Sequence, residues 1–396
     1  MSKYHYNFDE IIDRTNTYSE KWDEVDKIFL NSDLLPLWVA DMDFLSPPPI
    51  IDAFIKRAKH GIYGYTFLPP EYYDAIINWY ENRHDWKLQK KWITFTPGVI
   101  PALNIAIQSF TTPQDKVVIQ TPAYPPFFSA VRNNKRRRVL NSLRLINNHY
   151  EMDLDDLEKK INKEHPKILI LCSPHNPTGR VWKKSELIKI GDLCLENNIL
   201  VISDEIHCDL VYPNYKHVPF ASISEEFALN SITCTSISKS FNLPGLKLSN
   251  IIIPNQKLRS EFRRTCQRIG IAQPNCFGPS ILIAAYNKCE DWLNEVILYI
   301  QENLLYLKRY LNEHLPQLKV INPEGTYLVW IDFRNLGIEP KKLSSILLKK
   351  AKVALFEGYL FGKDGVGFNR INIACPRSIL KMALERIVKA IKNELK

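Results

Sequence analysis

Near-continuous hydrophobic runs alternate with amphipathic patterns through the middle of the chain. The runs lie at residues 117–120, 167–172, 199–203 and 231–234, and each has the length of a buried strand. Between the second and third runs, residues 184–197 have the pattern of a helix. Strands that are hydrophobic on both faces and separated by helices predict a parallel sheet covered by helices. We therefore predict an α/β fold whose ligands bind beyond the carboxyl ends of the strands.

The segments on either side of this region have different patterns. Before it, we predict helices at 50–59, 71–83 and 101–110, a strand at 92–95, and a short strand or an extended segment at 37–40. After about Gly278, helices at 279–287 and 290–315 precede short strands at 327–333, 353–356 and 370–374, and a helix at about 376–395. We predict a large domain at 46–285, a smaller α+β domain at 286–396, and an N-terminal segment at 1–45 that packs with the small domain.

Composition places the chain among soluble globular proteins, because 45% of its 396 residues are hydrophobic and 24% are charged. No hydrophobic run reaches the ~20 residues of a membrane helix, and the polar N-terminus, MSKYHYNFDEII, is unlike a signal peptide. The eight cysteines are scattered and form no C-x-x-C pair, which favours free thiols over disulfides or a zinc site. We therefore expect a cytoplasmic protein with no membrane partner.

Charge changes this picture only slightly. The formal net charge is +9, and the one dense basic run, KRRR at 135–138, is most typical of a solvated turn. The run has no interleaved aromatic residues and no helical recognition pattern, so nucleic acid is not an expected partner. A basic surface also favours small anionic ligands.

The segment TSISKSFNLPGLKLSN, residues 235–250, offers an amine at the end of a predicted strand. Lys239 lies there in a short polar turn, with Ser236 and Ser238 before it and Lys247 after it. A lysine so placed can hold a carbonyl-bearing cofactor as a Schiff base, with the serine hydroxyls as donors and Lys247 as a counter-charge. The same segment is compatible with a surface lysine in a serine-rich loop, so its interpretation depends on the rest of the chain.

Three other candidate side chains follow predicted strands. Asp204 comes directly after the strand at 199–203, where a carboxylate can pair with a protonated pyridine nitrogen or cap a turn. Asn176 lies in NPTG after another strand; it can donate a hydrogen bond to a phenolate oxygen, although NPTG is also an ordinary turn sequence. Tyr124, between an alanine and two prolines, can stack on an aromatic ring or pack in the core.

Two further candidates suit anions. Gly98, Val99 and Ile100 open a predicted helix, whose free N–H groups and dipole can bind a phosphate. Arg370 begins a short strand of the small domain, and a guanidinium there can bind a carboxylate through two hydrogen bonds. One glycine is a weak phosphate signal, and an arginine in R-x-N-x-A is also compatible with an ordinary strand-edge residue.

In this order and spacing, the candidates resemble those of the fold type I pyridoxal-phosphate (PLP) enzymes of the aspartate aminotransferase superfamily, from about Leu37 to the C-terminus. The resemblance implies Lys239 as the Schiff-base lysine, Asp204 at the pyridine nitrogen, Asn176 at the ring oxygen and Tyr124 stacked on the ring. It also implies that Gly98, Val99, Ile100 and Ser236 surround the phosphate, with Ser238 as a further cofactor-binding residue. Arg370 is then the residue that binds the α-carboxylate of an amino-acid substrate.

The resemblance places Ala40 with Tyr65, Tyr124 and Asn176 beside the substrate. It also places the Tyr65 hydroxyl on the phosphate of the neighbouring subunit, which implies a homodimer with shared active sites. Two cofactor-binding positions depart from the common aminotransferase pattern. His207 stands where many aminotransferases have a tyrosine, and Lys247 stands where they commonly have an arginine against the phosphate, so the cationic partner of the phosphate stays open.

Other motifs resemble the cystathionine β-lyase (C–S lyase) branch of the superfamily, often called the MalY/PatB type. They are FD at 8–9, RT at 14–15, KWD at 21–23, WVADMDF at 38–44, FTPGV at 95–99, TPAYPPF at 121–127 and SDEIH at 203–207. The branch implies a PLP-dependent lyase that cleaves L-cystathionine or related cysteine S-conjugates to a thiol, pyruvate and ammonia.

In the reaction that the resemblance implies, the substrate amine displaces Lys239, and the freed lysine removes the Cα proton as a general base. Two alternatives stay open. An aminotransferase of amino acids would return the proton to the cofactor, and a non-catalytic regulatory binding protein would use the same scaffold without turnover. Production of a keto acid without an acceptor keto acid separates the lyase from the aminotransferase.

Overall fold

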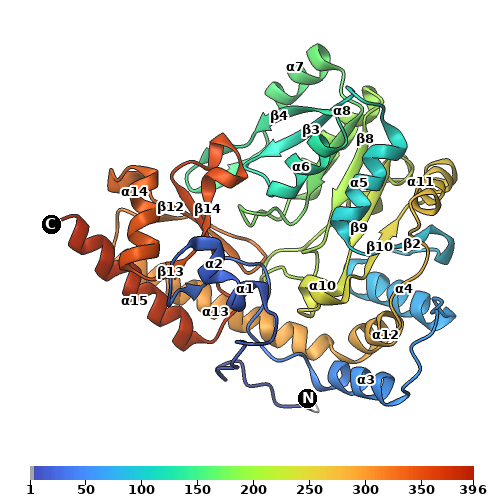
Figure 1. Ribbon diagram of the computed structural model, residues 1–396. Coiled ribbons are helices and arrows are strands. Elements are labelled where there is room, and N and C mark those ends of the chain that lie inside the picture. Colours follow the sequence, from blue (N-terminus) through green and yellow to red (C-terminus); the bar gives the residue numbers. More distant parts are fainter. Residues whose placement is uncertain (1–3) are drawn as a thin grey trace.

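A seven-stranded sheet forms the core of the larger part of the molecule (Figure 1). The computed structural model describes residues 4–396, and within them the strand order is β2–β10–β9–β8–β7–β3–β4. The strands are β2 (Ile93–Thr96), β3 (Lys116–Thr121), β4 (Arg137–Ser142), β7 (Ile168–Cys172), β8 (Leu200–Asp204), β9 (Ser231–Thr235) and β10 (Ser249–Ile252). Neighbouring strands are parallel except that β10 is antiparallel to β2 and β9. The predicted mostly parallel sheet is confirmed.

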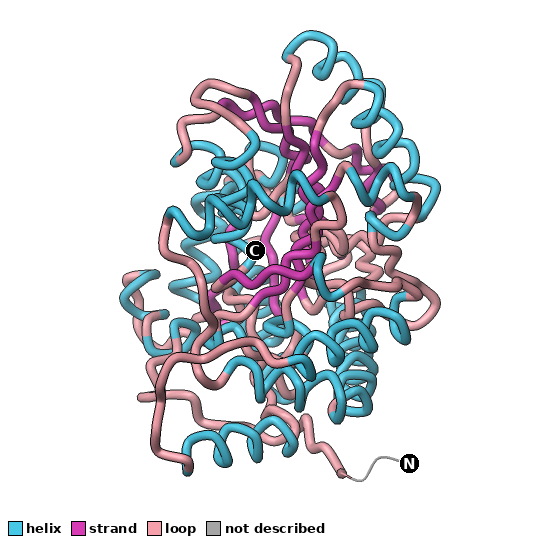
Figure 2. Tube along the Cα trace, turned by 90° about the vertical axis from the view of Figure 1, so that its right-hand side faces the viewer, coloured by secondary structure: helices cyan, strands magenta, loops and turns pink. Residues whose placement is uncertain are grey.

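Helices cover both faces of this sheet (Figure 2). One face packs against α5 (Val99–Phe110), α6 (Pro125–Asn133) and α11 (Gln256–Arg268), and the other against α7 (Leu154–Glu164), α8 (Lys184–Glu196) and α9 (Glu225–Leu229). In β7, Ile168 and Ile170 pack with the first group of helices, whereas Leu169 and Leu171 pack with the second. Side chains of a strand alternate between its faces, so burial on both sides explains the continuous hydrophobic runs of the sequence.

A smaller antiparallel sheet lies in the C-terminal part of the chain. Its order is β11 (Lys319–Val320), β12 (Leu328–Asp332), β15 (Phe368–Asn372) and β14 (Phe356–Glu357). Helices α13 (Glu290–His314), α14 (Pro340–Ser345) and α15 (Arg377–Glu394) belong to the same part of the chain (Figure 1). The N-terminal strand β1 (Leu35–Pro36) pairs in parallel with β13 (Val353–Ala354). The domain boundaries at 45 and 285 stay a prediction, and α12 (Gly278–Lys288) extends across the second.

The remaining helices and strands either belong to the first 84 residues or follow strands of the large sheet. They are α1 (Glu20–Asp23), α2 (Val25–Phe29), α3 (Pro48–Lys59), α4 (Pro70–His84), α10 (Ile237–Ser240), β5 (Arg144–Ile146) and β6 (His149–Glu151). The predicted helices at 50–59, 71–83, 184–197, 279–287, 290–315 and 376–395 agree with the structure to within two residues at each end. Helix α5 begins two residues before the predicted start at 101.

Two short segments differ from their predictions, and for a third the structure selects between two predicted alternatives. The strand predicted at 353–356 is two strands, because β13 pairs with β1 while β14 pairs with β15. The segment at 37–40 forms no strand, so of its two predicted alternatives only the extended segment is left. In the basic run, Lys135 lies in a turn, but Arg137 and Arg138 begin the edge strand β4, so the predicted turn is wrong for them. Their side chains are exposed, and charged side chains on an edge strand hinder its pairing with another sheet.

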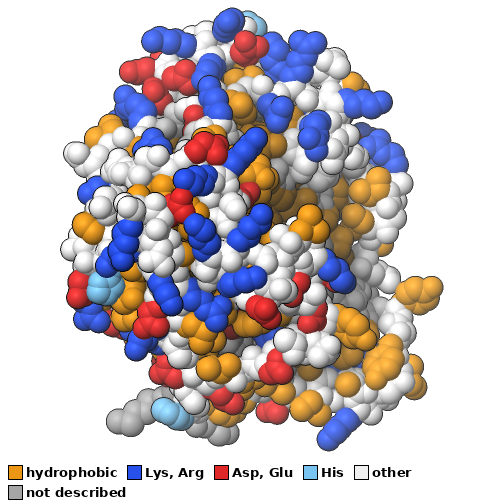
Figure 3. Space-filling model, turned by 60° about the vertical axis from the view of Figure 1, so that its left-hand side comes forward, with side chains coloured by type: hydrophobic (Ala, Val, Ile, Leu, Met, Phe, Trp, Pro, Cys, Tyr) orange, Lys and Arg blue, Asp and Glu red, His pale blue; other side chains and the backbone are white. Residues whose placement is uncertain are grey.

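The cysteines and the surface add three observations. All eight cysteines are free, and all except Cys276 are buried, so the predicted free thiols are confirmed. Within residues 4–396, no helix combines the length and the hydrophobicity needed to cross a bilayer. On the face drawn in Figure 3, lysine and arginine side chains are interspersed with acidic ones around a hollow that has hydrophobic walls.

Candidate active site

A cavity of about 480 Å³ collects most of the predicted site residues. Its walls contain Ala40, Gly98, Val99, Ile100, Tyr124, Asn176, Asp204, His207, Ser236, Ser238, Lys239 and Lys247. Phe127, Cys172 and Ile206 also line it, and their apolar side chains gave no signal that distinguishes them from core residues. Arg370 is not in the wall but contacts Asn176, and Tyr65 lies elsewhere on the surface.

The ends of the parallel strands bring these side chains together. Asp204 is the last residue of β8, Asn176 follows β7, and Tyr124 occupies the N-cap position of α6, after β3. Lys239 lies in α10, which follows β9. Because neighbouring parallel strands end at the same edge of a sheet, four stretches that are distant in sequence meet there.

The ε-amine of Lys239 contacts the N-terminal segment. Its Nζ donates a hydrogen bond of 2.7 Å to the carbonyl oxygen of Ala40. Burial, and next the positive charge of Arg370, lower the pKa of Lys239 to about 8. The negative charges of Asp41 and Asp204 oppose this shift. Near neutral pH, such an amine has a much larger neutral, nucleophilic fraction than a solvated lysine.

Asp204 is a buried carboxylate without an ionic partner. The residue is 4% exposed, and its side chain accepts a hydrogen bond of 3.2 Å from the N–H of Ile206. No ion pair among residues 4–396 includes it. Burial raises the pKa of Asp204 to about 7, although the hydrogen bond from Ile206 and the charge of Lys239 act in the other direction. A carboxylate in this state favours a cationic group next to it.

Arg370 is a buried cation with an incomplete set of acceptors. Its Nη1 donates to Oδ1 of Asn176 at 3.1 Å, and its Nη2 donates to the carbonyl oxygen of Trp38 at 2.8 Å. The guanidinium also lies over the rings of Phe356 and Phe361, at 4.7 and 5.3 Å from their centroids. Its Nε has no partner in the described part of the chain. Burial lowers the pKa of Arg370 to about 10, so an anion brought to it would relieve a desolvated charge.

His207 and Tyr124 add polar groups to the same cavity. His207 is buried, and its Nδ1 has no hydrogen-bond partner among the described residues. Burial, with the positive charges of Lys239 and Arg370, lowers the pKa of His207 well below its usual value, so the ring is neutral at pH 7. Burial also raises the pKa of the Tyr124 hydroxyl. Both rings therefore offer neutral hydrogen-bonding groups to a bound molecule.

The N-terminus of α5 opens into the cavity. Gly98 occupies its N-cap with φ 131°, a conformation that strains any residue with a side chain. Val99 and Ile100 follow in the first turn and also line the cavity. The N–H groups of a first turn have no partner within their helix, and the helix dipole is positive there. This helix end is therefore suited to an anion.

The Ser236 hydroxyl, which was predicted to donate to a phosphate, already has hydrogen-bond partners within the protein. The Ser236 hydroxyl donates to the carbonyl oxygen of Leu248 at 2.7 Å and accepts from the N–H of Ser238 at 3.0 Å. Ser236 must therefore break its bond to Leu248 before it can donate to a phosphate. Lys247 lies in the same wall, with φ 51°.

An N-terminal strap, residues 37–43, reaches the cavity through Ala40, and the sequence indicated only part of its contacts. Besides Lys239, Tyr327 donates to the Ala40 carbonyl, at 2.9 Å. The Asn372 side chain donates to the carbonyl oxygens of Val39 and Asp41 at 2.7 and 2.5 Å. The motif WVADMDF marked this strap, but nothing in the sequence marked Tyr327 and Asn372, because their role depends on contacts across about 290 to 330 residues.

A buried ion cluster holds the far end of the strap. Lys21 is fully buried, and its Nζ lies 2.6 Å from Asp43 and 3.6 Å from Asp41. Arg14 bonds Asp41 through two nitrogens, at 2.7 and 3.1 Å, and Asp43 at 2.7 Å. The Trp22 indole also donates to Asp43, at 2.9 Å. Two cations and two carboxylates therefore balance each other and fix the strap next to Lys239.

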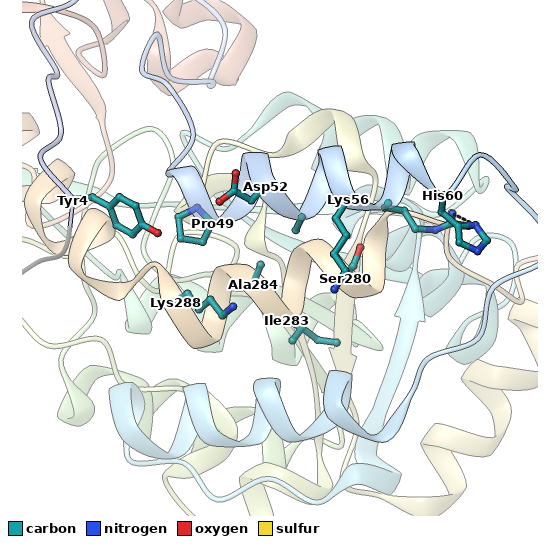
Figure 4. Close-up of a pocket in the computed structure, with 11 residues that line it drawn as sticks. Tyr4, Pro49, Asp52, Lys56, His60, Ser280, Ile283, Ala284 and Lys288 are labelled. Atoms are coloured by element: carbon teal, nitrogen blue, oxygen red, sulfur yellow. Dashed lines mark hydrogen bonds between the residues drawn. The ribbon is translucent and has the colours of Figure 1, made fainter.

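Tyr65 is separate from this site. Its side chain is fully exposed on the loop between α3 and α4. A larger cavity, of about 620 Å³, lies between α3 and α12 and contains none of the predicted site residues. Figure 4 shows Lys56 of α3 and Ser280 of α12 facing this second cavity, with Tyr4 at one end and His60 at the other.

The chain is similar to known proteins of one enzyme family, several of which contain PLP in their solved structures. Residues 32–387 match the aminotransferase class I and II family. The chain is 43% identical to cystathionine β-lyase PatB of Bacillus subtilis, over 97% of this chain and 100% of that protein. Among solved structures, cystalysin from Treponema denticola, which contains pyridoxal 5′-phosphate, matches with a TM-score of 0.95 and 40% identity, over 99% of this chain and 100% of cystalysin.

A PLP-bound putative aminotransferase from Clostridium difficile 630 matches with a TM-score of 0.96 and 48% identity, over 98% of this chain and 100% of that one. These likenesses extend over nearly the whole chain, and they confirm the resemblance and the fold type that the sequence motifs predicted. The chain therefore belongs to the aminotransferase class I and II family.

Proposed function

We propose that this protein is a PLP-dependent C–S β-lyase that cleaves L-cystathionine or related cysteine S-conjugates. The observation that carries the proposal is that Lys239, Asp204 and Asn176 meet at one cavity, with Arg370 bonded to Asn176. The similarity to a cystathionine β-lyase over nearly the whole chain supports the substrate class. The similarity to PLP-containing cystalysin supports the cofactor.

The cavity residues fit PLP. Asp204 is a buried carboxylate that lacks a cation, and a protonated ring nitrogen would supply one. The unpartnered Nδ1 of His207 and the N-terminus of α5 provide groups for the ring and the phosphate. We propose that Asn176 binds the ring oxygen, and that Lys239 forms the covalent attachment. Bound PLP supplies an electron sink that stabilises negative charge at the substrate Cα.

In the proposed reaction, Arg370 binds the α-carboxylate and Lys239 moves the proton. The neutral amine of Lys239 accepts the Cα proton, which its lowered pKa allows near neutral pH. The electron pair left at Cα forms a Cα–Cβ double bond while the Cβ–S bond breaks, and the sulfur leaves as a thiol after taking up a proton. The Ala40 carbonyl accepts a hydrogen bond from Nζ and so holds the freed amine in place. Addition of water to the remaining product gives pyruvate and ammonia.

The purified protein should release pyruvate and a free thiol in equal amounts from L-cystathionine, with PLP but without any added keto acid. The two products are measured in parallel with a lactate dehydrogenase assay and a thiol reagent. If turnover requires an acceptor keto acid and no thiol appears, the protein is an aminotransferase, the activity suggested for its Clostridium relative. If neither product forms while PLP binds, the non-catalytic binding protein is supported instead.

A prediction for Arg370 tests the carboxylate clamp. A planar guanidinium can bind a carboxylate through two hydrogen bonds, and lysine cannot reproduce this geometry. We expect Arg370→Lys to lower kcat/KM for L-cystathionine by about 10- to 100-fold, the equivalent of one or two charge-assisted hydrogen bonds. Its effect on the corresponding amine, which lacks the α-carboxylate, should be much smaller. An equal loss on both substrates would argue that Arg370 only supports the fold.

We also propose that the protein acts as a homodimer with shared active sites. Large hydrophobic side chains are exposed on α3 and on the loop that follows it: Ile51, Ile55, Ile62, Tyr63, Tyr65 and Phe67. Exposed hydrophobic side chains gathered in one stretch of the chain are typical of a protein interface. A two-fold dimer formed through this stretch would let each chain place Tyr65 at its partner's phosphate.

Mixing two inactive variants tests this sharing. In a heterodimer of Lys239→Ala and Tyr65→Ala chains, one site carries both defects while the other combines an intact Lys239 with an intact Tyr65 from the partner. Activity should therefore rise above that of either parent, towards about half of the wild-type value per heterodimer. Subunit exchange is confirmed by native mass spectrometry. Unchanged activity in confirmed heterodimers would mean that Tyr65 serves its own chain or only packs.

We place the protein in the cytoplasm on chemical grounds. All eight of its cysteines are free thiols. Free thiols are typical of reducing compartments, whereas proteins of oxidising compartments more often carry disulfides.

A further inference from the structure

Asp209 is the acceptor of a buried hydrogen-bond cluster behind the cavity wall. Its Oδ1 accepts from the Trp79 indole at 3.0 Å and lies 2.8 Å from Nε2 of His84 and 3.6 Å from Nε of Arg83. Its Oδ2 accepts from the Ser240 hydroxyl at 2.5 Å. Although burial opposes them, these partners lower the pKa of Asp209 to about 2. The group is therefore a fully ionised carboxylate with donors on both oxygens.

The partners on one side of Asp209 belong to a single packed helix. Trp79, Arg83 and His84 all lie on α4, within its last six residues. Helix α4 buries Tyr72, Ile76 and Tyr80 in the main hydrophobic core. A carboxylate fixed by three side chains of a packed helix has little freedom to move.

The donor on the other side belongs to a weak element. Ser240 directly follows Lys239 on α10, which has only four residues, Ile237–Ser240. A single helical turn is not stable by itself, so tertiary contacts must fix the position of Lys239. The Ser236 hydroxyl anchors the N-terminal end of α10 to the Leu248 carbonyl. The bond from Ser240 to Asp209 anchors its C-terminal end.

A metal site does not explain this cluster. His84, Cys208 and Asp209 present ligand atoms within 4.8 Å of one another. Burial raises the pKa of the Cys208 thiol well above its usual value, which disfavours the thiolate that a metal requires. Both Asp209 oxygens already accept hydrogen bonds, and the positive charge of Arg83 lies nearby. The arrangement is that of an anchored carboxylate.

We infer that Asp209 is a positioning residue, which aims Lys239 at the cavity by anchoring Ser240 to helix α4. This inference rests on the proposed attachment of PLP to Lys239 but not on the identity of the sulfur substrate. A shift of a reacting group by about 1 Å can slow its reaction by about a hundredfold. Loss of the anchor should therefore slow the reaction of Nζ with the PLP aldehyde more than it weakens non-covalent binding in the cavity.

Two ligands separate these effects in the cofactor-free protein. PLP reports the rate of covalent attachment through its visible absorbance. Deoxypyridoxine phosphate, which lacks the aldehyde, reports binding to the cavity without reaction at Lys239. We would compare wild type with Ser240→Ala and Asp209→Asn. Ser109→Ala serves as the matched control, because the Ser109 hydroxyl also donates within the fold, to Thr265 at 2.9 Å, between α5 and α11.

For Ser240→Ala, we expect attachment to slow by about 10- to 100-fold while the Kd of deoxypyridoxine phosphate changes by less than about twofold. Asp209→Asn also alters the contacts to Trp79 and His84, so it should slow attachment at least as much. The double variant should be no slower than Asp209→Asn alone, because Asp209 acts on Lys239 through Ser240. Ser109→Ala should change neither quantity. Melting temperatures of all the cofactor-free variants monitor folding.

Several outcomes would overturn the inference. One is a normal attachment rate in Ser240→Ala. Another is a parallel loss of attachment rate and of deoxypyridoxine phosphate affinity, which is the result expected from a merely structural role. If PLP attaches to wild type but no C–S lyase activity is found, the proposed reaction fails while the positioning role of Asp209 is still tested by the same rates.

Discussion

Replacing Lys239 with alanine is expected to abolish covalent attachment of PLP and to slow thiol release by about a thousandfold or more. In the proposed mechanism, one nitrogen serves both as the attachment point and as the base for the Cα proton, so its loss removes two contributions at once. Borohydride reduction of the wild-type protein should fix PLP irreversibly, and peptide mass mapping should find it on the peptide that contains Lys239. The visible absorbance of attached PLP should be missing from the variant.

Lys247 provides the control for this experiment, because it lines the same cavity and carries the same amine. Lys247→Ala should keep both the absorbance and the borohydride adduct at Lys239, and only its affinity for PLP should fall. An adduct on Lys247 in the wild-type protein would overturn the assignment of Lys239 and the mechanism that depends on it.

The rate of attachment should also depend on pH in a defined direction. Burial and the charge of Arg370 lower the pKa of Lys239 to about 8, and only the neutral amine attacks an aldehyde. The rate at which cofactor-free protein binds PLP covalently should therefore rise with pH and level off above about pH 8. A rate that still rises between pH 9 and 10 would show that Lys239 has the pKa of a solvated lysine.

The residues that could be predicted from the sequence are those whose position depends on a neighbouring strand. Asp204, Asn176 and Lys239 each follow a hydrophobic run, and parallel strands carry such residues to one edge of the sheet. Gly98 could be predicted for a similar reason, since it precedes a helix. In each case, a few consecutive residues specify both the strand or helix and the functional residue at its end.

The residues that could not be predicted depend on contacts between distant segments. Tyr327 contacts Ala40 across 287 positions, and Asp209 meets Ser240 across 31. Neither residue type nor spacing distinguishes Asp209 from any other aspartate that follows a strand. Ser236 was predicted as a phosphate donor, but its hydroxyl donates to a carbonyl that lies next to it only in the folded chain. For such residues, the fold must be known before a role can be assigned.

Replacing Asp204 with asparagine is expected to slow thiol release by about a hundredfold or more, the usual effect of removing a buried group that stabilises charge in the transition state. In the proposed site, the negative charge of Asp204 would keep the ring nitrogen of PLP protonated, and the neutral amide cannot do so. Single-turnover rates with L-cystathionine measure this loss. PLP should still attach to Lys239 in the variant, because the amine is unchanged. Near-normal turnover would show that Asp204 only caps a turn.

Although it slows the reaction, the same substitution should stabilise the cofactor-free protein above about pH 4. Burial raises the pKa of Asp204 from the ordinary 3.8 of an aspartate to about 7. The folded chain therefore keeps this proton between about pH 4 and pH 7, where the unfolded chain has lost it. The free energy of unfolding therefore falls as pH rises through this window. By pH 8 the loss is on the order of 4 kcal/mol, at about 1.4 kcal/mol for each pKa unit.

Asparagine carries no charge, so Asp204→Asn should be more stable than wild type in urea at pH 8, with the advantage shrinking towards pH 4. Bound PLP should reduce the advantage at pH 8, because in the proposed site its ring nitrogen would pair with the carboxylate of the wild type. A variant that is equally destabilised at both pH values would show that Asp204 ionises freely in the fold.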